Sequence, residues 1–355
     1  MKKLLFRTGI LLNWIFAALL LFSGFSVFIS PDIIPYTALL GLLFPFLIFV
    51  NIIFLIFRIF YKKGYFFISL LALVLSFYRI KDSYAFQNKK VVSAPINPLK
   101  VMSYNVRMFD IYNWTGNNSG DSILEIIKRE NPDIICIQEF YSNNKFDYQN
   151  KIINIQKTKD YIISSKNKSG YSGNAVFSKY PIISSGYVDV GSEKQKCIYA
   201  DIVKFRDTVR VYSIHLASIH LDDNDYEFMK KINENDKEKN IEGVKDISQK
   251  LLNAYEIRAK EVKTLAPHIE SSPYPVIVCG DFNDTPVSYT YKTIKGNLKD
   301  AFLTCGTGIG HTYAKSLPLF RIDYIFYDKK MNAASFRRIK KDFSDHYPVS
   351  CIIEL

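Results

Sequence analysis

The segment PVIVCGDFNDTP, residues 275–286, joins a short apolar run to a cluster of polar side chains. The run Val276–Cys279 is rich in β-branched residues and is bounded by Pro and Gly, which predicts a strand buried on both faces. Directly after it, Asp281 and Asn283 place a carboxylate and a carboxamide at the C-terminal end of that strand. Ligands of α/β proteins bind where strands end, so this segment predicts a functional site at that end of a sheet.

Short apolar runs rich in Val, Ile and Tyr recur on both sides of this segment. They predict eight strands: Lys100–Val106, Asp133–Glu139, Asn174–Ser178, Cys197–Lys204, Thr208–Leu216, Val276–Asp281, Ile322–Tyr327 and Val349–Glu354. Apolar residues at helical spacing predict helices over Asp121–Glu130 and Ile241–Ile269. Because strands outnumber helices and some neighbours are spaced as hairpins, we expect a mixed-sheet α/β domain.

Several of these strands end or begin in residues of the types that handle phosphate and magnesium. The six triplets are Ser103-Tyr104-Asn105, Ile137-Gln138-Glu139, Ser213-Ile214-His215, Asp281-Phe282-Asn283, Arg321-Ile322-Asp323 and Ser344-Asp345-His346. Each has an ordinary explanation when taken alone, such as a solvated Glu, a capping Asp or a hydrogen-bonded His. Six such triplets in one domain favour a shared site.

The residue types at these positions suit one kind of chemistry. Mg²⁺ takes hard oxygen ligands, needs few carboxylates and keeps room for water and a substrate phosphate. The chain has no Cys and His set at zinc spacing, no nucleophilic serine elbow and no Gly-x-x-x-x-Gly-Lys phosphate loop. Of these reaction types, metal-assisted attack of water on a phosphoester is the one that remains.

Seven motifs then occur in one order: SYNVR, IQEF, GNAVFSKYPI, SIHL, GDFNDTP, RIDYIF and SDHYPV. In this order they resemble the endonuclease/exonuclease/phosphatase superfamily, which includes deoxyribonucleases, apurinic endonucleases, neutral sphingomyelinases and inositol-polyphosphate 5-phosphatases. The resemblance covers about residues 99–355. It implies two mixed β-sheets packed face to face with flanking helices, a four-layer α/β sandwich, and a hydrolase of phosphoester bonds that uses Mg²⁺, with Mn²⁺ as an alternative cation.

The resemblance also implies a metal site. Glu139 resembles the principal Mg²⁺ ligand, and Asn105 resembles the residue beside it. Asp345 resembles a second acidic residue near the metal or the water.

Five further positions resemble residues that act on the phosphate and the water. Asp281 resembles the residue that aligns or deprotonates the attacking water, and Asn283 the one that orients the phosphate. His346 resembles the residue that stabilises charge on the phosphoryl oxygens or protonates the leaving group, and Asp323 its orienting partner. His215 resembles a residue that contacts the scissile phosphate. A carboxylate near His346 would hold one tautomer and raise the pKa of the imidazole.

Two residues after the first strand keep two interpretations each. Arg107 follows Asn105 closely and is either structural or in contact with phosphate. Trp114 lies in the Gly- and Asn-rich loop YNWTGNNSGD, either as an exposed loop aromatic or as part of a substrate rim.

Three apolar segments come before this domain, at about residues 9–29, 37–58 and 64–79. Their lengths predict two or three transmembrane helices, so we expect a membrane anchor over residues 1–83, a linker over 84–98 and the catalytic domain over 99–355. A cleaved signal peptide is the alternative for the first segment. Residues 1–90 hold ten Lys and Arg but only two acidic residues, which places +8 of the net charge of +12 there.

The basic residues also bear on orientation. Those before the first segment and after the second predict a cytoplasmic N-terminus, and a third span would then place the catalytic domain outside the cytoplasm. Lys81 and other basic residues after the third segment argue against that placement. We therefore expect a multi-pass protein of the cell membrane with an extracytoplasmic catalytic domain.

Substrate identity is the least determined property. The lipid bilayer is the expected partner, it favours a lipid or a small extracellular phosphoester as substrate, and no obligate protein partner is implied. A metal-dependent nuclease is the alternative, although the charge of about +4 over residues 91–355 gives nucleic acid little support. A catalytically dead, tethered binding module is the third interpretation.

The five cysteines form no C-x-x-C pair, and we expect them to be buried thiols.

Overall fold

The structure is a computed structural model that describes residues 2–61, 66–86, 95, 97–158, 160–168, 170–191, 197–219, 225, 228, 237–315 and 319–355. Most of the expected linker, residues 87–94 and 96, lies outside the described residues. The chain divides into two compact units. The helical unit comprises Met1–Ser83, Ala217–Lys260 and Val287–Lys292, and the sheet unit comprises Tyr84–Leu216, Glu261–Pro286 and Thr293–Leu355. All seven motifs fall in the sheet unit.

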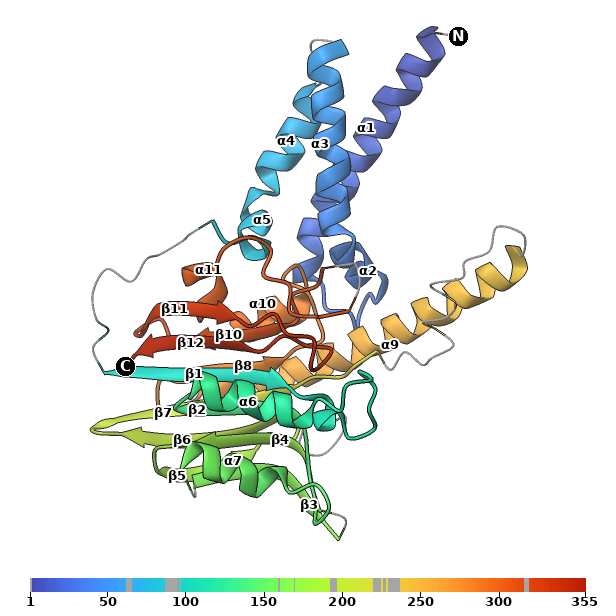
Figure 1. Ribbon diagram of the computed structural model, residues 1–355. Coiled ribbons are helices and arrows are strands. Elements are labelled where there is room, and N and C mark those ends of the chain that lie inside the picture. Colours follow the sequence, from blue (N-terminus) through green and yellow to red (C-terminus); the bar gives the residue numbers. More distant parts are fainter. Residues whose placement is uncertain are drawn as a thin grey trace. The chain divides into compact units, whose positions relative to one another are not determined.

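The sheet unit contains two six-stranded sheets (Figure 1). The first has the order β11-β12-β1-β2-β4-β3 and is built from β1 (Pro98–Asn105), β2 (Ile134–Ser142), β3 (Asp160–Asn167), β4 (Gly170–Ser178), β11 (Asn332–Arg338) and β12 (Val349–Glu354). The second has the order β5-β6-β7-β8-β10-β9 and is built from β5 (Ile182–Tyr187), β6 (Cys197–Lys204), β7 (Asp207–His215), β8 (Val276–Asp281), β9 (Lys299–Asp300) and β10 (Asp323–Tyr327). Each sheet has one parallel pair, β1 with β2 and β7 with β8, among antiparallel pairs. The expected pair of mixed sheets is confirmed.

A hydrophobic core lies between the two sheets. Side chains alternate along each strand, so that Val101 of β1 and Cys136 of β2 join Ile277 and Cys279 of β8 in one buried cluster. Met102 of β1 points to the opposite face and belongs to a second cluster. All five cysteines are buried thiols that form no disulfide bond, in agreement with the expectation from their spacing.

Helices cover the outer faces of the sheets. The first sheet carries α6 (Gly120–Glu130) and α7 (Tyr148–Gln156) (Figure 1). Their buried Ile127 and Ile152 belong to the same cluster as Met102. On the second sheet, the Tyr212 hydroxyl of β7 lies 2.9 Å from Nδ1 of His268 in the last turns of the long helix α9 (Lys237–Glu270). Among the elements whose bounds the structure describes, the other helical ones after β1 are η2 (Arg107–Asp110), α10 (Tyr289–Lys295) and α11 (Ala301–Cys305).

Strand register brings the polar strand ends together. Asn105 pairs with Gln138 across β1 and β2, and His215 pairs with Asp281 across β7 and β8. Asp281 in turn pairs with Asp323 across β8 and β10. The predicted site residues therefore end at matching positions within each sheet.

The helical unit holds the three apolar segments. They form α1 (Lys2–Phe25), η1 (Ser26–Phe28), α2 (Tyr36–Leu42), α3 (Phe44–Tyr61), α4 (Phe66–Leu75) and α5 (Phe77–Ser83). Within the described part of the chain, one continuous helix, Phe6–Phe28, is long and apolar enough to cross a bilayer. Such a helix near the N-terminus serves as a membrane anchor or as a signal sequence.

The expectation of two or three transmembrane helices is therefore corrected. The second expected span is broken between α2 and α3, which meet at 56°, so it counts as a span only if the bent pair acts as one. The third is divided between α4 and α5, and the ten residues of α4 rise only about 15 Å, half of a bilayer core. Without a third span, the extracytoplasmic placement of the catalytic domain loses its basis.

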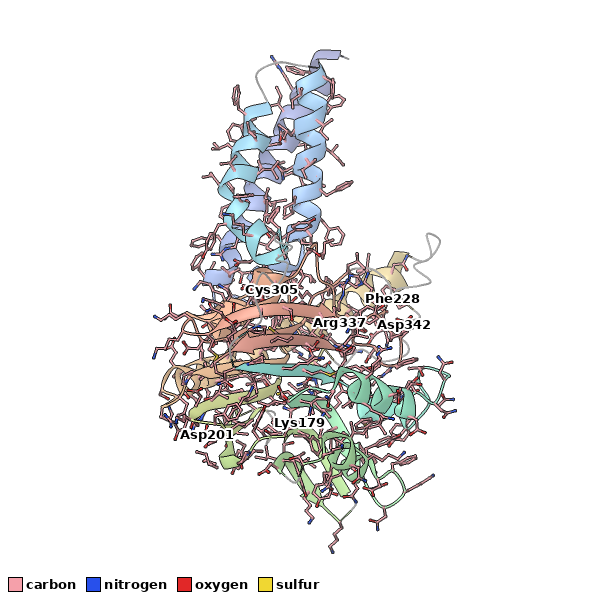
Figure 2. The ribbon with its side chains drawn as sticks, turned by 60° about the vertical axis from the view of Figure 1, so that its left-hand side comes forward. Lys179, Asp201, Phe228, Cys305, Arg337 and Asp342 are labelled. Atoms are coloured by element: carbon pink, nitrogen blue, oxygen red, sulfur yellow. The ribbon has the colours of Figure 1, made fainter. Side chains whose placement is uncertain are left out.

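Helices α1, α3 and α4 pack against one another with polar groups between them. The Ser69 hydroxyl donates to Asn13 Oδ1 at 2.6 Å, and the Asn51 amide donates to the carbonyl of Phe16 at 3.0 Å. Apolar side chains project from the outside of the same helices (Figure 2), and the exposed ones include Leu11, Trp14, Phe22, Phe49, Ile53, Phe67, Leu71 and Val74. The interior of this bundle is an apolar cluster that includes a few hydrogen-bonded polar groups, and the exterior is apolar as well.

The close pairing of β8 with β7 depends on Gly280, which lies opposite Ile214. The φ of Gly280 is +153°, and a Cβ at this position would overlap the carbonyl oxygen of Ile214 in the neighbouring β7. We expect Gly280→Ala to destabilise the fold by about 3 kcal/mol, a fall of on the order of 10 °C in the melting temperature. The control is Gly116→Ala, because Gly116 also has a positive φ, +76°, but has no atom within 4 Å of the added Cβ. The control should lose about 1 kcal/mol, and equal melting temperatures for the two variants would contradict the steric argument.

Candidate active site

Asn105, at the end of β1, links carboxylates from both sheets. Its Nδ2 donates to Glu139 Oε1 at 2.9 Å and to Asp281 Oδ2 at 3.1 Å. Its Oδ1 accepts from the backbone N–H of Arg107 at 3.0 Å. The amide therefore presents its nitrogen to both carboxylates and positions Glu139, while its oxygen is already engaged.

Glu139 occupies an irregular position in β2. Its φ is +51°, and the pairing of β2 with β4 shifts register between Ile137 and Phe140. A bulge of this kind re-aims a side chain, and here it turns Glu139 toward the strand ends. The side chain is 35% exposed. Burial raises the pKa of Glu139 and the negative charge of Asp345 adds to this, while the hydrogen bond from Asn105 opposes it.

Asp281, at the end of β8, is buried at the centre of the site. Its Oδ1 accepts from the backbone N–H of Asn283 at 2.8 Å. Its Oδ2 lies 3.6 Å from His346 Nε2 and 3.8 Å from His215 Nε2. Burial raises the pKa of Asp281 above its ordinary value, although the two imidazoles act in the opposite direction.

His346 lies between two carboxylates. Its Nδ1 is 2.9 Å from Asp323 Oδ2, while its Nε2 faces Asp281. Burial alone would lower the pKa of His346, but the carboxylates of Asp323 and Asp281 outweigh it and raise this pKa well above its ordinary value. Asp323 Oδ1 is buried and has no hydrogen-bond partner among the described residues. The two carboxylates therefore favour the protonated form of the imidazole.

The last two predicted residues are held by neighbouring chain segments. Asn283 donates from Nδ2 to the carbonyl of Leu216 at 3.0 Å, which fixes its side chain at the end of β7. Asp345 Oδ2 lies 3.5 Å from Arg107 Nε. The Ser344 hydroxyl donates to the carbonyl of Asn105 at 2.8 Å. This hydrogen bond holds the SDH segment, Ser344-Asp345-His346, at the end of β1.

Asn105, His215, Asn283 and His346 thus contact Asp281, Glu139 and Asp323 lie one contact further away, and Asp345 directly precedes His346 in the chain. A polar layer beneath them was not predicted. Gln138 accepts from the Ser103 hydroxyl at 3.4 Å and donates to the Ser213 hydroxyl at 3.2 Å, which joins β1, β2 and β7 across the two sheets. The available signal was a polar residue in each of the motifs SYN, IQE and SIH, at a strand position that should face the core.

Two groups of side chains are candidates for a divalent cation. Asp281, Asp323 and His346 lie close enough together to hold one. However, Nδ1 of His346 is already engaged by Asp323 Oδ2, and Nε2 faces Asp281 Oδ2 at 3.6 Å. Glu139 and Asp345 offer carboxylate oxygens that are partly exposed, 35% and 17%, which leaves room for water and a phosphate. This donor set fits a hard cation better.

Comparison with solved structures identifies the same fold. An endonuclease/exonuclease/phosphatase from Bacteroides vulgatus matches with 18% identity over 73% of this chain and 99% of its own, at a TM-score of 0.53. D. rerio TDP2 complexed with single strand DNA product matches with 16% identity over 73% and 99% of the two chains, at 0.51. The human Nocturnin catalytic domain with bound sulfate matches with 18% identity over 74% and 96%, at 0.50. At these identities the likeness concerns the fold alone.

No curated protein matches the sequence. Residues 2–83 match the model of a domain of unknown function (DUF8431). Residues 102–346 match the model of the Endonuclease/Exonuclease/phosphatase family, whose members are generally divalent-metal-dependent hydrolases of phosphoester bonds. Because this match covers more than half of the chain, the protein belongs to the endonuclease/exonuclease/phosphatase family.

Proposed function

We propose that this protein is a membrane-anchored hydrolase of phosphoester bonds, a phosphodiesterase or phosphatase that depends on Mg²⁺. The observation that carries the proposal is the position of Asp281. Its buried carboxylate lies between two imidazoles and an amide, beside the partly exposed Glu139. Such a set can take a proton, give a proton and bind a phosphate at one place.

Glu139 and Asp345 are the residues that would hold the cation. When bound, the cation supplies positive charge that offsets the charge developing on the phosphoryl oxygens. Mg²⁺ is preferred because both protein ligands are carboxylates, and no sulfur or imidazole ligand is needed.

Asp281 is the proposed base. A water molecule adds through its oxygen to phosphorus and gives its proton to the Asp281 carboxylate, whose raised pKa makes it a better acceptor than an ordinary aspartate. The bond between phosphorus and the leaving oxygen breaks at the same centre. His346 gives its Nε2 proton to that oxygen or stabilises charge on the phosphoryl group. The products are an alcohol and a phosphate with one ester bond fewer.

The other predicted residues hold these groups in place. Asp323 keeps the proton on Nδ1 of His346 and thereby aims Nε2 at the reaction centre. Asn283 orients the phosphate from a side chain that is fixed on the carbonyl of Leu216. His215, 3.8 Å from both Glu139 Oε1 and Asp281 Oδ2, contacts the scissile phosphate.

The proposal of a membrane anchor rests on the helical bundle. Polar side chains such as Asn13, Asn51 and Ser69 are buried and hydrogen-bonded between helices, while the outside of the bundle is apolar. In water this pattern would leave many large apolar side chains in contact with solvent. In a bilayer it is the favourable one, because lipid solvates the apolar exterior and the polar groups satisfy one another inside.

The first experiment assays the full-length chain in detergent. With Mg²⁺ it should release p-nitrophenol from bis(p-nitrophenyl) phosphate, and EDTA should abolish the release. Asp281→Ala and His346→Ala should each lower kcat by about a hundredfold or more, because each removes a proton-transfer group. The control is Asp328→Ala, because Asp328 follows β10 at the end away from the site.

Near-native turnover in either variant would show that its role is wrongly assigned. Activity that survives EDTA would contradict the proposed dependence on a metal ion. A parallel panel of DNA, RNA, phospholipid and inositol phosphate identifies the substrate, and nicking of plasmid DNA as the dominant activity would favour the nuclease alternative.

The role of Asp323 is tested through pH. Its carboxylate raises the pKa of His346, so the imidazole of the native enzyme stays protonated to higher pH than an ordinary histidine. Asp323→Asn should remove most of this effect, and the loss of kcat on the alkaline side should move to lower pH. The measurement is the pH profile of kcat, with Asp328→Asn as the control. A lower kcat with an unshifted alkaline limb would mean that Asp323 acts only through packing.

The anchor is tested by fractionation. We expect the native chain to stay in the membrane fraction through an alkaline carbonate wash and to leave it only with detergent, because the apolar exterior needs an amphiphile. Intact mass spectrometry should find residues 1–83 retained. Release by carbonate would contradict the anchor, and a mature chain that begins after Phe28 would identify α1 as a cleaved signal sequence.

A further inference from the structure

An unusual turn follows Asn105. The four residues of η2, Arg107 to Asp110, all have left-handed φ values between 45° and 57°, and none of them is glycine. Each such residue costs about 1–2 kcal/mol, so a run of four persists only where surrounding contacts hold it.

Two anchors hold this turn. Phe109 is buried and stacks on Tyr148 of α7, with ring centroids 4.0 Å apart and an interplanar angle of 11°. The carboxylate of Asp110 accepts from the backbone N–H groups of Thr115 and Ser119, both at 3.1 Å. The turn and the loop after it are therefore fixed on the first sheet.

The fixed turn places Arg107 between the candidate metal ligands and a tryptophan. On one side its Nε lies 3.5 Å from Asp345 Oδ2. On the other side its guanidinium carbon lies 4.7 Å from the ring centroid of Trp114. Trp114 in turn lies 4.9 Å from Tyr112, centroid to centroid, and the two side chains are 45% and 65% exposed.

The composition of this loop points to one kind of ligand. Exposed aromatic faces stack flat heteroaromatic rings, and an arginine beside them adds a cation–π contribution and a phosphate contact. Between Arg107 and Asp121 the chain has no other Lys or Arg, so the loop lacks the row of cations that follows a polynucleotide backbone. An acyl chain offers no flat ring to stack. One ring beside one phosphate fits the loop best.

We propose that Arg107, Tyr112 and Trp114 form a ring platform that binds the nucleobase of a phosphoester of mononucleotide size. The inference rests on the proposed function, since the scissile phosphate lies at the carboxylates next to Arg107. It assigns to the loop the selection of substrates, while the strand ends carry the reaction.

Two substrates with the same leaving group test the platform. The p-nitrophenyl ester of thymidine 5′-phosphate and p-nitrophenylphosphorylcholine both release p-nitrophenol, but only the first carries a nucleobase. The native enzyme should have the higher kcat/KM for the thymidine ester. Trp114→Ala should lower the ratio of the two kcat/KM values by about five- to a hundredfold, mainly through KM, because stacking on one aromatic ring is lost. Trp114→Phe should retain most of the ratio.

The matched control is Phe205→Ala, which removes an 80% exposed aromatic from the turn between β6 and β7, at the opposite end of β7 from His215. It should leave the ratio unchanged. The proposal is overturned if Trp114→Ala also leaves the ratio unchanged. An equal fall of both kcat/KM values would give that result and would indicate a purely structural role.

A binding measurement separates this inference from the proposed function. The chain has two tryptophans, Trp14 and Trp114, so Trp114 alone reports on the loop in a Trp14→Phe variant of the full-length protein. In EDTA, thymidine 5′-monophosphate should quench its emission at concentrations where phosphocholine does not. If neither ester is hydrolysed but quenching occurs, the proposed function fails and the platform stands. If the esters are hydrolysed but the emission is unaffected, the platform fails.

Discussion

The burial of one carboxylate, that of Asp281, constrains where the surrounding chain segments can end. A charged group taken out of water costs several kcal/mol unless partners compensate it, and Asp281 has partners from four other chain segments. Asn105 donates from β1, Asn283 from the following turn, and His215 and His346 approach from β7 and the SDH segment. Each of these segments must therefore end at one point. A shift of one residue in any strand would turn its site residue to the other face and leave the charge uncompensated.

The packing of the two sheets serves the same constraint. Asn105 belongs to the first sheet and Asp281 to the second, so their hydrogen bond works only if the sheets pack in one position. The layer Ser103–Gln138–Ser213 lies directly beneath and joins the sheets by hydrogen bonds within an otherwise apolar core. A buried polar layer of this kind contributes little net stability, but it disfavours any sliding of one sheet over the other, because a shift leaves its groups unpaired.

The sequence predicts the interior of the fold better than its edges, for a physical reason. All eight predicted strands are present, and the strands that were missed, β3, β5, β9 and β11, are the outer strands of the two sheets. Inner strands need apolar side chains on both faces, whereas edge strands carry polar residues that discourage further pairing, as in IISSGY of β5 and NAASFRR of β11. Hydropathy likewise overcounted the membrane spans, because it does not reveal the breaks at Leu43 and Ser76. The left-handed turn at Arg107 contains no glycine, so the sequence gives no sign of it.

Rigidity is distributed unequally around the site, and this separates reaction from selection. Asp281, Asp323 and His346 are buried and bonded to strands or to one another, so their positions follow from the core and leave little freedom to vary. Arg107 and Trp114 stand on a turn whose strain is balanced by local anchors alone, and a change of loop sequence could rebuild that turn without disturbing a strand. A fold arranged in this way can keep one hydrolytic centre while its loops adapt to different phosphoesters. Under the proposed function, the strand ends would carry the chemistry and the loop after β1 would select the substrate.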